Sequence, residues 1–127
     1  MSTVFTPKVQ LVLGWLFTAL SASVMIASAI AKFVQPTGFA EGFAQLGWPI
    51  HFAIPLGVLE LCCTALYLFP RTAVLGAILI TGYMGGAVAA HLRVGDPFVV
   101  QVLLGAAVWG GLYFRNPRVR GLIPLID

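Results

Sequence analysis

Charged residues are scarce in this sequence, at 9% of its 127 residues. Soluble domains are about a quarter charged and about half apolar, whereas this chain is 60% hydrophobic and has a mean hydropathy of +1.00. A water-soluble fold has too few polar residues here to cover its surface. The scarcity of charge therefore excludes an ordinary soluble domain and predicts an integral membrane protein.

Residues suited to metal, disulfide or nucleic-acid chemistry are also few. The two cysteines, Cys62 and Cys63, are adjacent and form no CxxC motif, so we expect them to pack as small apolar side chains. The two histidines, His51 and His91, occur in no HxxxH or ExxH spacing, which predicts no metal site. The net charge is +3, but the positive charges are scattered singly, which predicts no nucleic-acid partner.

Four long apolar runs make up most of the chain, with expected spans at about residues 9–33, 51–69, 72–91 and 97–114. A helix needs roughly 17 to 25 residues to cross the hydrocarbon core of a bilayer. Because the connections are short, the sequence predicts an all-α fold, a transmembrane four-helix antiparallel bundle that forms one domain over residues 1–127. Rows of small residues at four-residue spacing predict tight packing, within the chain or between copies in a homo-oligomer.

A short amphipathic segment between the first two runs carries its larger apolar side chains on roughly one helical face: Phe39, Phe43, Leu46 and Trp48. Glu41 points elsewhere. We expect this segment to anchor in the membrane interface; the alternative is a lid over the mouth of the bundle.

The basic residues predict the orientation in the membrane. With four spans, both termini lie on one side, and most of the lysines and arginines lie on that side with them: Lys8, Arg71, Arg115, Arg118 and Arg120. Only Asp127 offsets them there. The positive-inside rule therefore predicts that both termini are cytoplasmic.

Glu60 lies in the middle of the second run, nine residues after His51 and eleven before Arg71. About 13–16 Å of helix separates it from each interface. Because an ionised carboxylate at this depth costs about 2.5 kcal/mol or more, we expect its side chain to face the bundle interior, hydrogen-bonded or protonated.

Further polar residues predict an interior polar seam around Glu60. Thr64 and Tyr67 follow it at i+4 and i+7, on the same helical face. The first run carries a matching stripe: Ser21, Met25, Ser28 and Lys32. Three residues of the other runs lie nearest to the depth of Glu60: Ser21, Thr81 and Tyr83. In the functional interpretation Glu60 exchanges protons or anchors a ligand such as a quinone head. In the structural one it joins helices through one of these three residues or through Lys32.

Lys32 and His91 lie at the outer ends of the first and third runs. If these helices pack together, the two side chains converge at one mouth and form a headgroup-binding site or a proton entrance toward Glu60. In the alternative, Lys32 and Arg93 extend separately to the interface, and Arg93 pairs with Asp96.

Three segments and Lys32 together resemble the DoxX-like family of small bacterial four-helix membrane proteins. The segments are GVLELCCTALYLFPRTAVLGA (57–77), TGYMGGAVAAHLRVGDP (81–97) and VWGGLYFRNPRVRGLIP (108–124). The resemblance implies a membrane component connected with quinone or thiol redox chemistry, and Lys32, Glu60 and His91 match polar positions that recur in the family.

We therefore expect a multi-pass protein of the bacterial inner membrane that acts as an accessory or quinone/lipid-binding subunit linked to redox metabolism. It is not expected to be an enzyme on its own; any enzymatic role is that of a membrane subunit of a quinone-linked oxidoreductase. Its expected partners are the lipid bilayer, a soluble or membrane redox protein and further copies of itself, with quinone as the cofactor that the resemblance implies. Two alternatives are a small-solute or proton transporter or channel-like oligomer, and a purely structural helix-packing protein.

Overall fold

The structure, a computed structural model, describes residues 5–126, and within them it is all-helical. The elements follow in the order α1 (Pro7–Val34), α2 (Phe39–Gln45), the 3-10 turn η1 (Ile50–Phe52), α3 (Ala53–Leu68), α4 (Ala73–Arg93), α5 (Val99–Arg115) and α6 (Pro117–Arg120).

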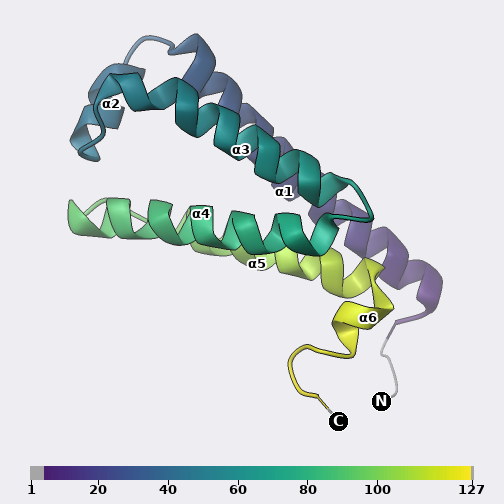
Figure 1. Ribbon diagram of the computed structural model, residues 1–127. Helices are drawn as coiled ribbons and strands as arrows, with labels where there is room; N and C mark the ends of the chain where they lie inside the picture. The colour runs from purple at the N-terminus through teal and green to yellow at the C-terminus, as the bar shows by residue number, and fades with distance from the viewer. Residues whose placement is uncertain (1–4, 127) are drawn as a thin grey trace.

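The four apolar runs correspond to α1, α3, α4 and α5, which alternate in direction along the chain (Figure 1). The expected all-α fold is confirmed, but the described part of the chain holds six α-helices, because α2 and α6 add two short ones. By length and composition three of its helical segments can cross a membrane, Pro7–Val34, Ile50–Leu68 and Ala73–Arg93, and Val99–Arg115 is shorter.

Local sequence explains where the helices begin and end. Thr6 caps α1 by accepting a hydrogen bond from the Val9 amide at 3.3 Å, and Pro7 occupies the first turn. The helix ends at Gln35, which adopts a left-handed conformation (φ 51°) directly before Pro36. The expected end of the first span, at about residue 33, therefore lies within one residue of the observed end of α1 at Val34.

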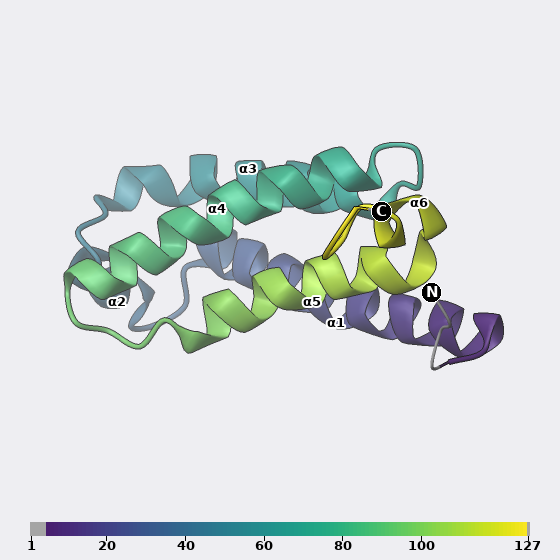
Figure 2. The ribbon, with the colours of Figure 1, turned by 90° about the horizontal axis from the view of Figure 1, so that it is seen from below.

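The long helices form a ring in which α1 and α4 each pack against both α3 and α5. In Figure 1 the pair α1 and α3 diverges from the pair α4 and α5 toward the end where α2 lies. The pairs converge at the opposite end, where α6 lies beside them (Figures 1 and 2). We call these the α2 end and the α6 end of the bundle.

Glycines allow the close approach at the α6 end. A Cβ atom on Gly14 of α1 would lie 2.7 Å from the Arg115 backbone nitrogen of α5, and one on Gly111 would lie 2.6 Å from the Tyr67 hydroxyl of α3. A Cβ atom on Gly76 of α4 would overlap the backbone of α3 at Leu66 and Tyr67. These three close approaches therefore each depend on a missing side chain.

The buried core fills the bundle from its middle to the α6 end. Its members are Met25, Cys63, Tyr67, Ala73, Ala77, Ile80, Met84, Val108, Leu112 and Val119. The Tyr67 hydroxyl donates to the Val108 carbonyl oxygen at 2.7 Å and lies 3.3 Å from the Thr18 hydroxyl. Cys63 is buried there as expected of a packing residue, whereas its neighbour Cys62 is exposed.

The outward faces of the long helices carry large exposed apolar side chains, among them Leu16, Leu20, Ile78, Val100 and Leu103. Exposed apolar surface of this extent is unfavourable in water and favourable against acyl chains. Together with the apolar spans, it identifies the chain as a membrane protein.

The glycine contacts give a first prediction. Gly76→Ala should lower the free energy of unfolding by about 1–3 kcal/mol, because the added methyl group meets the α3 backbone, which cannot move aside as a side chain can. Gly85→Ala on the same helix is the matched control, since a Cβ atom there meets nothing within 4 Å. Unfolding in detergent measures both. Equal stability of the two variants would contradict the packing argument.

Candidate functional site

A cavity of about 670 Å³ lies between the diverging helices at the α2 end. All four long helices contribute to its walls, and α2 with the residues after it lines the mouth. The polar side chains along its lining are Ser28, Lys32, Gln45, Glu60, Tyr83, His91, Asp96 and Gln101.

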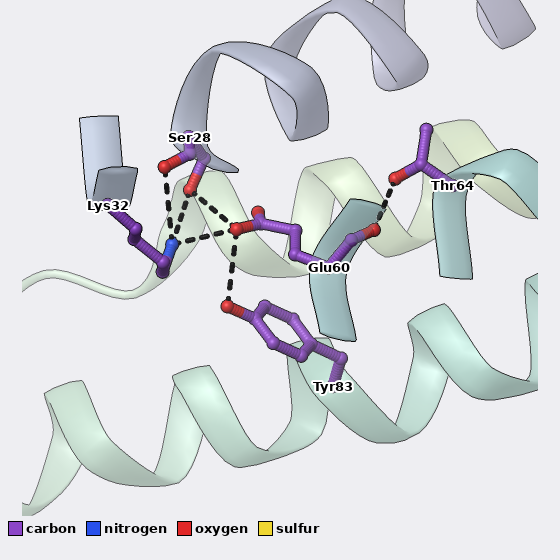
Figure 3. Close-up of polar contacts among 5 residues, drawn as sticks. All are labelled: Ser28, Lys32, Glu60, Thr64 and Tyr83. Atoms are coloured by element: carbon purple, nitrogen blue, oxygen red, sulfur yellow. Dashed lines mark hydrogen bonds and ion pairs between the residues drawn. The ribbon is translucent and has the colours of Figure 1, made fainter. Parts of the chain in front are cut away.

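Glu60 points into the bundle and is 1% exposed, which confirms its expected orientation. Its Oε2 atom accepts hydrogen bonds from Lys32 Nζ at 2.8 Å, from Ser28 Oγ at 3.3 Å and from the Tyr83 hydroxyl at 3.3 Å. Figure 3 shows these three donors, from α1 and α4, meeting one oxygen of the α3 carboxylate. A single carboxylate therefore connects three helices.

Lys32 extends from the last turn of α1 toward Glu60. Its Nζ atom also donates to Ser28 Oγ at 2.8 Å, and its side chain is 12% exposed. Lys32 and Glu60 form the one ion pair found among residues 5–126. The positive charge offsets the buried carboxylate, which would otherwise be costly at this depth. The alternative in which Lys32 extends separately to the interface is therefore wrong.

The other hydroxyl groups expected near Glu60 are bound elsewhere. Ser21 Oγ donates to the Phe17 carbonyl oxygen at 2.8 Å, and Thr81 Oγ1 donates to the Ala77 carbonyl oxygen at 2.7 Å and accepts from Trp109. A serine or threonine within a helix can bond to the carbonyl one turn earlier without any tertiary partner. A position at the depth of Glu60 is therefore not enough to bring Ser21 or Thr81 into contact with its carboxylate. Neither residue joins Glu60 to another helix.

Thr64 and Tyr67 share the Glu60 face of α3 as predicted, but neither bonds to its carboxylate. Thr64 Oγ1 donates to the Glu60 backbone carbonyl oxygen at 2.8 Å, and Tyr67 belongs to the packed core. The polar seam thus divides into a charged part at the cavity and a neutral part in the core.

His91 and Lys32 both line the cavity. Their helices α1 and α4 pack against α3 and α5, whereas the expectation assumed that they pack against each other. The His91 Nδ1 atom lies 2.7 Å from the Ala87 carbonyl oxygen, and Gln101 Nε2 lies 3.3 Å from the imidazole Nε2 atom. Gln101 was missed as a site residue, although a lone amide in the fourth apolar run was a usable signal. Ser28 belonged to the predicted stripe but was not singled out.

The segment of residues 36–49, here called the lid segment, contributes lining residues to the cavity. It lies beside the connection between α4 and α5 (Figure 2), which its hydrogen bonds reach. Arg93 Nη2 donates to the Leu46 carbonyl oxygen at 2.7 Å, and Gln45 Nε2 donates to Asp96 Oδ1 at 3.4 Å. Arg93 therefore contacts the lid segment, and the expected Arg93–Asp96 pair is wrong. Phe43 of α2 is buried and lines the cavity. A lid thus describes the segment better than a plain interfacial anchor.

The ion pair gives a second prediction. Lys32→Met leaves Glu60 charged and unpaired and should lower the free energy of unfolding by about 3–5 kcal/mol. Glu60→Gln should cost less, because the amide can keep the Ser28 and Tyr83 contacts and the partly exposed lysine can turn toward the interface.

Unfolding in detergent should also show the double variant Lys32→Met/Glu60→Gln to be more stable than Lys32→Met alone, since it buries no lone charge. A larger loss for Glu60→Gln than for Lys32→Met would refute this account of the pair.

Comparison with known proteins gives one match. The model of the DoxX-like family matches residues 16–112, a stretch that contains Lys32, Glu60, Tyr83, His91 and Gln101. No curated protein and no solved structure matches the chain. The family match covers most of the sequence and every polar residue around the cavity, and the chain belongs to the DoxX-like family.

Proposed function

We propose that this protein binds the polar head of a membrane amphiphile, of the quinone or lipid class, in the cavity at its α2 end. The observation that carries the proposal is the combination of an apolar-walled cavity with the Lys32–Glu60 pair along its lining. Its volume of about 670 Å³ falls within the roughly 300–1,000 Å³ typical of small-molecule sites. A few convergent polar groups in an apolar wall are also typical of such sites.

The open space beside the charged pair supports binding over a purely structural role. An ion pair whose only role is to join helices is best covered by packed side chains. The polar contact between the Tyr67 and Thr18 hydroxyl groups at the α6 end is covered in this way. Glu60 instead borders a cavity, which a ligand can fill.

The shape of the bundle supports binding over transport. The cavity ends where the packed core begins. Beyond it, at the α6 end, the contacts of Gly14, Gly76 and Gly111 bring the helices together. A transport path would have to pass through Tyr67, Val108 and Leu112, which are all buried. A cavity open at one end suits a protein that holds its ligand.

The proposal includes a membrane arrangement. All four long helices cross the bacterial inner membrane, and α5, with 17 residues, is at the lower limit of length. Both termini face the cytoplasm, in accord with the basic residues gathered there in the sequence. The chain then acts as an accessory subunit that holds the amphiphile for a partner protein of redox metabolism.

A cavity-filling substitution tests the binding proposal. Gly86 of α4 lines the cavity, and a Cβ atom there meets nothing within 4 Å. Gly86→Leu should therefore fill the cavity without disturbing the helices and lower the affinity for decylubiquinol, the hydroquinone form of a short-chain quinone, at least about tenfold. The neighbouring Gly85 is equally free of contacts but does not line the cavity, so Gly85→Leu is the matched control.

Calorimetric titration in nanodiscs measures the affinities, and native mass spectrometry of the gently solubilised protein reports the co-purifying amphiphile. Equal binding by both variants would show that the cavity is not the site. Flux of a solute or of protons across reconstituted vesicles would favour the transporter instead.

A further inference from the structure

The hydrogen-bond donors that surround Glu60 are already engaged. Lys32 Nζ carries three hydrogens and has three acceptors within reach, Glu60 Oε2, Ser28 Oγ and, at 3.5 Å, the Ser28 carbonyl oxygen. The hydroxyl groups of Ser28 and Tyr83 each have one hydrogen and donate it to Glu60 Oε2 (Figure 3). This cluster therefore has no donor left for a ligand.

The acceptor oxygens without a donor along the same cavity include Glu60 Oε1 and Gln101 Oε1. Glu60 Oε1 accepts no hydrogen bond from any residue in the range 5–126, and no dashed line reaches it in Figure 3. Gln101 Oε1 is a buried atom without a hydrogen-bond partner among the same residues. Buried polar atoms without a partner, as Gln101 Oε1 is, are few in folded proteins, and each calls for an explanation.

The orientation of the Gln101 amide follows from its neighbour. The His91 Nδ1 atom faces the Ala87 carbonyl oxygen at 2.7 Å, so in the neutral ring this nitrogen carries the hydrogen. The other ring nitrogen, Nε2, is then an acceptor, and the amide group of Gln101 donates to it at 3.3 Å. This arrangement fixes the amide nitrogen toward His91 and leaves Oε1 as the free acceptor.

We propose that the cavity selects an uncharged head that donates hydrogen bonds, a phenolic or alcoholic hydroxyl, with Gln101 Oε1 and Glu60 Oε1 as its acceptors. The inference rests on the proposed binding function. Lys32 cancels the charge of Glu60, so the pair calls for no ionic head. The remaining charged side chain of the lining, Asp96, is a further acceptor, which takes a hydrogen bond from Gln45. A hydroquinone or an alcohol supplies the missing donors, whereas a quinone brings only acceptors.

Gln101 can present its oxygen to such a ligand with little movement. The terminal torsion of glutamine is a soft sp³–sp² rotation with broad minima. A modest turn of the amide brings Oε1 toward the cavity that the residue already lines.

A matched pair of probes tests the inference: a decyl resorcinol, with two hydroxyl groups, and its dimethyl ether, which keeps the ring, the chain and the oxygen acceptors but has no donor. Calorimetric titration into the wild-type protein in nanodiscs should show the resorcinol binding about tenfold or more tightly than the ether, as expected for one or two additional hydrogen bonds.

Gln101→Met should reduce resorcinol affinity by about tenfold and leave ether affinity unchanged, because it removes one acceptor and keeps the side-chain length. Gln10→Met, the same exchange at a buried glutamine of α1 outside the cavity, is the control and should change neither affinity. Melting temperatures provide a further readout, since the variant removes the unsatisfied oxygen together with the hydrogen bond to His91, and the resulting loss of stability should be small.

The outcomes separate the two proposals. Binding of neither probe would overturn the proposed function itself. Equal or tighter binding of the ether would overturn the donor-selecting inference and leave the binding function standing. Parallel loss of melting temperature and of affinity for both probes in Gln101→Met would assign the amide a structural role and also overturn the inference.

Discussion

The ion pair between Lys32 and Glu60 is the constraint on which the rest of the α2 end depends. Removing a carboxylate and an ammonium from water costs several kcal/mol for each ion, and their attraction repays that cost only with good geometry and further hydrogen bonds. Ser28 and Tyr83 supply those bonds to the same carboxylate oxygen. Because Lys32 reaches inward from the last turn of α1, the pair sets how α1 and α3 lie along each other, while Tyr83 brings in α4.

Glycine has opposite consequences at the two ends of the bundle. At the α6 end Gly14, Gly76 and Gly111 let backbones approach until a single methyl group would collide. At the α2 end Gly82 and Gly86 face open space, and their missing side chains become part of the cavity. The same residue type thus permits tight packing where helices converge and leaves volume where they diverge. The wedge shape in Figure 1 follows from this difference together with the charged group that the open end must accommodate.

Much of the fold could be predicted from the sequence, because membrane spans depend mainly on the length of apolar runs. The inward orientation of Glu60 followed from the cost of exposing a carboxylate to lipid, and Lys32 was within reach as its partner. The hydroxyl contacts could not be predicted, since Ser21 and Thr81 bond to their own helices and depth alone does not fix how a helix is rotated. The lone amide of Gln101 stood out in the sequence, but its contact with His91 and its unpartnered oxygen are visible only in three dimensions.

The stabilities of the two ends also differ in a way that bears on ligand entry. The α6 end is held by buried contacts such as the hydrogen bond from Tyr67 to the Val108 carbonyl. The lid segment is held to the rest of the bundle by exposed hydrogen bonds, from Arg93 to Leu46 and from Gln45 to Asp96, and by the burial of Phe43. Exposed contacts of this kind contribute little, so local opening of the segment costs far less than unfolding the core. If the cavity binds an amphiphile as proposed, the ligand can enter past the lid segment while Glu60 and its three donors stay in place, which keeps these groups preorganised in both states.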